Sequence, residues 1–182
     1  FVVVSDDAKE KMKNRKTPIA SFYANLMTFD GYYEKKWFPY TMPISDIYGL
    51  RAAFNLIAGD KTLYERHARI GSATRAAVKE AGLKLHLQSG YSNTVTVFDI
   101  PECTDAKSIL DEMRTKYNIM LAGSFDELSG KVIRIGHMGE NARLEHMVPA
   151  LEALSATLTD LGVTLQGNLA DLFLKHYREF QD

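Results

Sequence analysis

One arginine stands inside an apolar run with the composition of a buried β-strand, in GKVIRIGHMGEN at residues 130–141. An uncompensated guanidinium is costly to bury, so Arg134 needs an anionic partner. The residues alone leave two interpretations open. Arg134 pairs with an internal carboxylate such as Asp126 or Glu127, or the strand delivers it to a pocket whose anion comes from solution. The planar arginine fork matches a carboxylate in both cases.

A second candidate lies in FPYTMPISDIYGLR, residues 38–51, where Thr41 comes just before a predicted helix start. A hydroxyl beside the free N–H groups of a helix N-terminus suits a phosphate. The same residues are also typical of an ordinary turn with a helix cap, with Ser45 placed to cap the helix. The neighbouring aromatic residues Trp37, Phe38 and Tyr40 are typical of a core or an interface.

Two further reactive side chains have weaker support. His137 follows Arg134 by three residues in a turn, and it either faces a site or only satisfies local backbone groups. Cys103 in PECTD is the lone cysteine and sits among turn residues, which favours a loop position over a nucleophile. No HExxH, GxSxG, Walker-type or GxGxxG motif is present, and the five histidines lack ligand spacing, so we expect no metal site.

Composition excludes several classes of function. The 182 residues are 46% hydrophobic and 25% charged with a formal net charge of −1, which is typical of a globular protein and gives no basic field for nucleic acid. No apolar stretch approaches the ~20 residues of a membrane helix. A single cysteine cannot form an internal disulfide, so we expect a reducing, cytoplasmic location and no membrane partner.

The elements that must position these residues follow from periodicity and turn signals. An apolar run at 1–4 predicts a strand and 6–14 a polar helix, while the aromatic and proline-rich stretch 21–43 predicts mostly loop. Beyond it, a helix is predicted from the cap Ser45 to near Gly59, and further helices at 61–81, 104–118, 144–161 and 165–180. Strands are predicted after Gly82 and at 94–100, 119–123 and 131–136. This order predicts an α+β fold, a small mixed or antiparallel sheet with helices on one face.

Five stretches together resemble the C-terminal part of class V pyridoxal-phosphate-dependent aminotransferases of fold type I, specifically the serine–pyruvate and alanine–glyoxylate group. They are YTMPISDIYGLR, ERHAR, TVTVFDIP, IMLAGSFDELSGKVIRIGHMGEN and the amphipathic helix before Leu161. The resemblance implies three parts: residues 1–43, a remnant of the large domain plus connector; residues 44–162, the C-terminal small domain; and residues 163–182, an extra amphipathic helix. Residues 165–182 then extend past the usual end of the family, with no functional assignment.

The resemblance also implies roles for individual residues. Arg134 would bind the α-carboxylate of the amino or 2-oxo acid, so that its partner is the substrate. Thr41 would contact the phosphate of pyridoxal 5'-phosphate across a homodimer interface. Family members often have a tyrosine at the position of Phe38 that reaches the same phosphate; here Tyr40 is the candidate substitute.

The resemblance further implies that the lysine that forms the Schiff base with the cofactor lies upstream of this chain, so that no catalytic residue lies within it. We therefore expect the parent enzyme to move an amino group from alanine or serine to glyoxylate or pyruvate, and this chain alone to be inactive. The alternatives are a non-enzymatic dimerisation or regulatory module derived from this fold, and another branch of the family such as a desulfurase or a phosphoserine-type transaminase.

Overall fold

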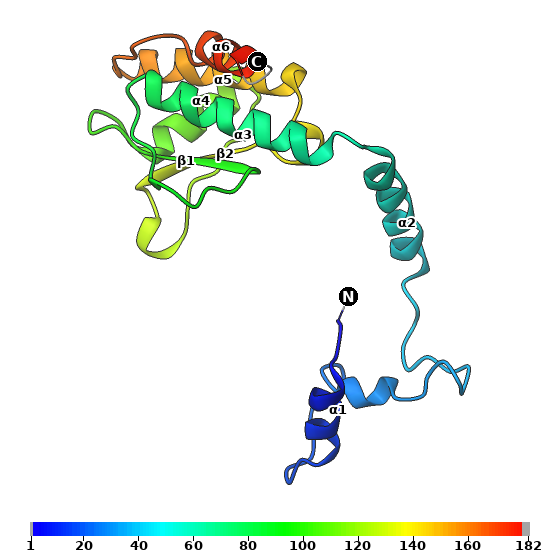
Figure 1. Ribbon diagram of the computed structural model, residues 1–182. Helices are drawn as coiled ribbons and strands as arrows, with labels where there is room; N and C mark the ends of the chain where they lie inside the picture. Colours follow the sequence, from blue (N-terminus) through cyan, green and yellow to red (C-terminus); the bar gives the residue numbers. More distant parts are fainter. Residues whose placement is uncertain (1, 180–182) are drawn as a thin grey trace. The chain divides into compact units, whose positions relative to one another are not determined.

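The computed structural model describes residues 2–179 of the chain (Figure 1). The elements are, in chain order, α1 (Asp6–Lys13), the 3-10 helix η1 (Leu26–Phe29), α2 (Ile44–Gly59), α3 (Leu63–Glu80), β1 (Val95–Asp99), α4 (Ala106–Tyr117), η2 (Asp126–Leu128), β2 (Val132–Gly136), η3 (Gly139–Asn141), α5 (Leu144–Asp160) and α6 (Leu169–Glu179). This is the α+β fold that the sequence predicts.

The chain divides into two compact units, Phe1–Ala58 and Gly59–Asp182. The boundary falls at the end of α2, whereas the sequence places a domain boundary between residues 43 and 44. The three-part division at 1–43, 44–162 and 163–182 concerns the domains of the whole protein and stays a prediction.

The first unit consists of α1, η1, α2 and long loops, and none of its described residues is buried. The helix α1 forms as predicted, with the Ser5 side chain accepting from the Ala8 N–H at its start. Residues 2–4 are not in a strand, so that part of the prediction is wrong, while Phe1 lies outside the described residues. The prediction that Ser45 caps this helix is also wrong, because α2 already begins at Ile44 and Ser45 is its second residue.

The second unit contains a two-stranded antiparallel sheet, with β1 paired to β2 in the register Thr96 to Ile135 and Phe98 to Ile133. Within this unit the helices α3, α4, α5 and α6 lie over one face of the sheet (Figure 1). The predicted strands after Gly82 and at residues 119–123 are reduced to single antiparallel bridges, Leu85 to Phe98 and Ala122 to Arg134.

The buried core of the second unit lies between the sheet and the helices. Its largest fully buried apolar side chains come from α3, both strands, α4, α5 and α6: Ile70, Phe98, Ile109, Met113, Ile133, Ile135, Leu151, Leu154, Leu158, Leu169 and Phe173. Fully burying a side chain of this size contributes about 1.5–3 kcal/mol. This core therefore fixes the position of β2 and of the arginine that it carries.

The last helix, α6, is an integral part of this core. The buried Ser155 hydroxyl accepts from the Leu169 N–H at 2.8 Å, and the Asn168 side chain accepts from the Ala170 N–H at 2.8 Å, so the first free amides of α6 are satisfied. Phe173 then inserts fully into the core. Phe180, which the sequence placed on this helix, lies outside the described residues.

Candidate functional site

Arg134 lies on the sheet face opposite to the helices. Its strand neighbours Ile133 and Ile135 are buried in the core, and the alternation of a β-strand turns Arg134 to the other side, where it is half-buried. It stands opposite Val97 of β1. On its other flank the Arg134 N–H donates to the Ala122 carbonyl at 2.7 Å, which ties the loop before β2 to the strand.

The guanidinium of Arg134 has no carboxylate partner among residues 2–179. Its Nε–H donates to the Gly123 carbonyl, and its Cζ lies 5.5 Å from the centroid of the Phe125 ring. The internal pairing with Asp126 or Glu127, one of the two interpretations above, is therefore wrong for this structure. What remains is a half-buried cation whose two terminal nitrogens have no partner in the described part of the chain.

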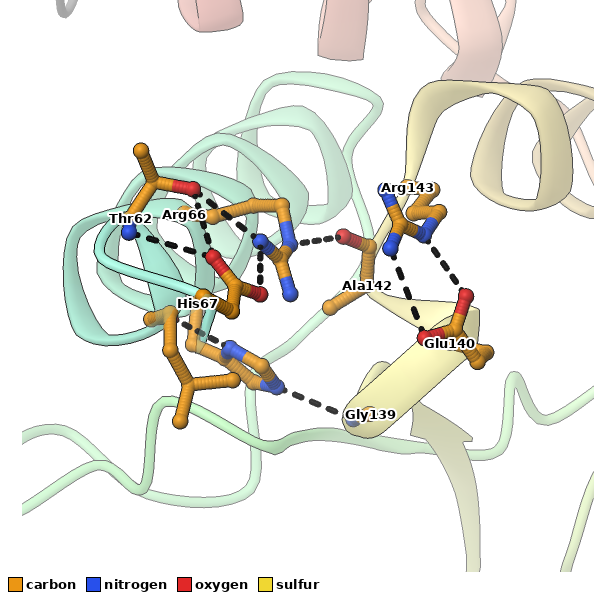
Figure 2. Close-up of polar contacts among 9 residues, drawn as sticks. Thr62, Arg66, His67, Gly139, Glu140, Ala142 and Arg143 are labelled. Carbon is orange, nitrogen blue, oxygen red and sulfur yellow. Dashed lines mark hydrogen bonds and ion pairs between the residues drawn. The ribbon is translucent and has the colours of Figure 1, made fainter. Parts of the chain in front are cut away.

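The loop that follows β2 is held to the start of α3 by a polar cluster (Figure 2). Arg66 pairs with Asp60 at 2.7 Å, and its Nε–H donates to the Ala142 carbonyl at 3.0 Å. The Arg66 guanidinium holds the pKa of the Asp60 carboxyl below its ordinary value. The Thr62 hydroxyl also donates to Asp60, at 2.9 Å.

His67 forms the second attachment of this loop (Figure 2). Its Nδ1 lies 2.6 Å from the Leu63 carbonyl, and its Nε2 lies 3.0 Å from the amide nitrogen of Gly139. A carbonyl only accepts and an amide N–H only donates, so the ring carries its proton on Nδ1 and accepts on Nε2. Sequence analysis missed Arg66 and His67 as positioning residues, although ERHAR carried part of the family resemblance.

Of the two roles predicted for His137, the structure shows the one in which it satisfies nearby groups of the protein. Its side chain is fully buried, Nδ1–H donates to the Asn93 carbonyl at 3.1 Å, and Nε2 accepts from the Thr96 hydroxyl at 2.8 Å. Burial lowers the pKa of His137 to about 4, so the ring is neutral near pH 7. With both nitrogens satisfied by the protein, His137 is a structural residue of the sheet.

Thr41 lies exposed in the first unit, three residues before the start of α2. Its hydroxyl makes no hydrogen bond within residues 2–179, so it is available to an external acceptor. Asp46 already brings a negative charge to the first turn of α2. The hydroxyl, more than the helix dipole, therefore makes this position suitable for a phosphate.

Tyr40 fits a phosphate less well than Thr41. Its hydroxyl donates to the Phe22 carbonyl at 2.7 Å, and its ring packs against Tyr23 and Phe29. Phe38 belongs to the same aromatic cluster through Phe29. Phe38 and Tyr40 thus pack with other rings, whereas Trp37 is 57% exposed and joins no ring pair within the described residues. None of the three is buried, so the interpretation as core is wrong for this unit, and the interpretation as an interface stays a prediction.

Other kinds of site find little support within residues 2–179. No group of three or more histidine, cysteine, aspartate or glutamate side chains there is arranged to hold a metal ion. None of the helices described has the length and apolar character needed to cross a bilayer. Cys103 is exposed, and its thiol lies 3.8 Å from the Gly162 carbonyl. No basic side chain within residues 2–179 forms a hydrogen bond with this thiol that would activate it.

The chain is similar in sequence to the serine–glyoxylate aminotransferase of Methylorubrum extorquens, with 36% identity over 165 residues, which are 86% of this chain and 40% of that protein. The crystal structure of pyridoxamine–pyruvate aminotransferase from Mesorhizobium loti matches 97% of this chain and 46% of its own, with a TM-score of 0.83 and 31% identity. The crystal structure of ureidoglycine–glyoxylate aminotransferase from Bacillus subtilis matches 94% of this chain over 46% of its own length, with a TM-score of 0.84 and 30% identity. No family model matches.

These matches bear on how far the family resemblance extends along the chain. The chain spans less than half the length of each of these relatives. Because one of them covers 97% of the chain, residues 165–182 cannot lie wholly beyond the family fold. The packing of α6 in the core agrees with this coverage, while the division at residue 163 stays a prediction.

Proposed function

We propose, on the premise that this chain belongs to the class V pyridoxal-phosphate-dependent aminotransferases, that the whole protein moves an amino group from a small amino acid such as alanine or serine to a 2-oxo acid. Glyoxylate or pyruvate is the acceptor named for each of the three relatives above. All these acceptors carry one carboxylate beside the reacting carbonyl. A site for a small carboxylate is therefore the feature that the relatives have in common.

The observation that carries the proposal is the unpaired guanidinium of Arg134. A half-buried arginine with neither terminal nitrogen engaged by the described chain is suited to a bidentate carboxylate. In the proposed reaction Arg134 binds the α-carboxylate of donor and acceptor in turn. It thereby orients the carbon that gains or loses the amino group, and a fixed orientation lowers the entropic cost of the reaction.

Pyridoxal 5'-phosphate, the cofactor of this family, supplies an electron sink for the bonds at the amino-bearing carbon when it is bound. In this chain the residue that fits its phosphate is Thr41, with an exposed hydroxyl free of internal hydrogen bonds. Tyr40 is the weaker candidate because the Phe22 carbonyl already accepts from its hydroxyl. We propose that Thr41 holds the phosphate across a homodimer interface, and that the lysine which binds the cofactor lies outside these residues.

Replacement of Arg134 by alanine in the whole protein tests this function. We expect KM for the amino acid to rise steeply while the cofactor's visible absorbance band stays, with a loss in kcat/KM on the order of 2–5 kcal/mol. Arg134→Lys keeps the charge without the fork and should recover only part of the loss. Arg114→Ala is the matched control, because Arg114 is an exposed arginine whose one ion pair among the described residues is with Asp111.

Unchanged kinetics in Arg134→Ala would refute the carboxylate role.

A comparison of the whole protein with the 182-residue chain tests the prediction that residues 1–182 alone are inactive. After incubation with pyridoxal phosphate and gel filtration, the whole protein should keep the visible band and the 182-residue chain should not. A retained band on the 182-residue chain would contradict the placement of the lysine outside it.

A further inference from the structure

The loop of residues 122–130 contacts Arg134 through Ala122, Gly123 and Phe125 before the chain enters β2. Its backbone folds into the 3-10 turn η2, in which the Leu128 N–H donates to the Phe125 carbonyl at 3.1 Å and the Ser129 N–H to the Asp126 carbonyl at 3.1 Å. The loop is bridged to β2 at Ala122. It is therefore an ordered part of the surroundings of Arg134.

One carbonyl of this loop determines which edge of the guanidinium remains open. An arginine can bind a carboxylate with its two terminal nitrogens, end-on, or with Nε and one terminal nitrogen, side-on. The Gly123 carbonyl accepts from the Nε–H of Arg134, so the side-on edge is already used. Only the end-on edge is left for an incoming carboxylate.

One aromatic side chain of the same loop covers a face of the guanidinium. The Cζ of Arg134 lies 5.5 Å from the centroid of the Phe125 ring, within the range of a cation–π contact. Phe125 is 75% exposed and has no aromatic partner among the described residues, so packing in the core does not explain its presence. The next residue, Asp126, has a left-handed backbone with φ 49°, a conformation that costs free energy outside glycine and is tolerated best by aspartate and asparagine.

We propose that this loop positions Arg134 for its substrate, with the Gly123 carbonyl fixing an end-on fork and the Phe125 ring covering one guanidinium face. The inference rests on the proposed function and adds two positioning groups and one binding geometry to it. Phe125 acts through Arg134: it limits the rotation of the guanidinium and keeps water from one side of it. A carboxylate then meets a cation that is already oriented and partly desolvated.

Substitutions at Phe125 in the whole protein separate this role from simple packing. Phe125→Leu keeps an apolar side chain without the ring, and we expect KM for the amino acid to rise about threefold to tenfold with kcat changed less than about twofold. Phe125→Tyr restores the ring face and should resemble the parent. Met120→Ala is the matched control, because it removes another highly exposed apolar side chain from the same connection between α4 and β2.

Propionate provides a readout that needs no turnover, because it carries the carboxylate without an amino or oxo group. Its dissociation constant should rise about threefold to tenfold in Phe125→Leu and stay unchanged in Phe125→Tyr and Met120→Ala. Propionamide, its neutral analogue, should not compete. A crystal structure of the whole protein with propionate should place both carboxylate oxygens on the terminal nitrogens of Arg134.

The outcomes distinguish this inference from the function on which it rests. If Phe125→Leu behaves like Met120→Ala while Arg134→Ala still raises KM, the loop has no positioning role and the proposed function stands. Propionate bound through Nε would overturn the end-on geometry alone. If Arg134→Ala changes neither KM nor propionate binding, the carboxylate site itself is wrong.

Discussion

Two polar side chains three residues apart, Arg134 and His137, meet opposite conditions in the fold. His137 is fully buried, and Asn93 and Thr96 satisfy its two ring nitrogens. Arg134 is half-buried, and its terminal nitrogens have no partner within residues 2–179. A satisfied buried group contributes to stability, whereas an unsatisfied charged group is a candidate for ligand binding.

His137 gives a prediction about stability in acid. Burial lowers its pKa in the folded chain to about 4 from an ordinary value of 6.5. Between these values the unfolded chain binds a proton that the folded chain does not, so stability falls as the pH decreases. We expect His137→Gln to be less stable than the parent at pH 7 and the difference to shrink by about 3 kcal/mol by pH 4.

Urea unfolding followed by circular dichroism at several pH values measures this difference. The comparison of variant with parent is needed because lowered pKa values of carboxyls such as Asp99 also weaken the fold in acid. His146→Gln is the control, because His146 is exposed and has no side-chain hydrogen bond among the described residues. If the difference in the free energy of unfolding between His137→Gln and the parent did not change with pH, the lowered pKa of His137 would be contradicted.

At the scale of the elements, the start of α3 fastens the loop that follows β2. Arg66 reaches the Ala142 carbonyl, and His67 accepts from the Gly139 N–H (Figure 2). Asp60, just after α2, completes the cluster through its ion pair with Arg66. The cluster thus joins the entry of the second unit to the end of the strand that carries Arg134.

Removal of Arg66 is expected to destabilise this attachment. Ala142 is fully buried, so Arg66→Ala leaves its carbonyl without this donor and leaves Asp60 without its ion pair. We expect a loss of about 1–3 kcal/mol in the free energy of unfolding, measured by urea denaturation. Arg114→Ala removes an exposed helical ion pair and should change stability by less than about 0.5 kcal/mol. Equal effects of the two substitutions would show that the cluster contributes no more than a surface ion pair.

Periodicity predicted the helices and both strands of the sheet, because amphipathic repeats such as those of α4 and α5 report burial directly. It failed at Leu85 and Ala122, where apolar residues resemble strands but pair only through single bridges. Strand length depends on which neighbours pair, and sequence spacing does not encode this. The contacts of Arg134 with Gly123 and Phe125 could not be predicted either. The Gly123 contact is made by a backbone carbonyl, which every residue has, and Phe125 is an exposed side chain, which the hydrophobic pattern does not place.

At the scale of the whole molecule, the buried core belongs to one unit, whereas the candidate site residues belong to both. The buried apolar core lies entirely in the second unit, from Ile70 to Phe173, and no described residue of the first unit is buried. Arg134 belongs to the second unit and Thr41 to the first. The proposed reaction therefore needs both units, whereas the cooperative core needs only one.

Deletion of residues 1–58 tests this distribution. Because the deletion removes no described core residue, we expect residues 59–182 to unfold in one cooperative thermal transition, with a midpoint within about 4 °C of the full 182-residue chain by circular dichroism. A shorter chain that begins at Leu63 is the matched comparison, because it also lacks Asp60 and Thr62, the partners of Arg66. Its midpoint should fall below that of residues 59–182, since Arg66 then loses its anion. A broad, non-cooperative transition for residues 59–182 would mean that the first unit contributes to the core in a way that burial within the described residues does not reveal.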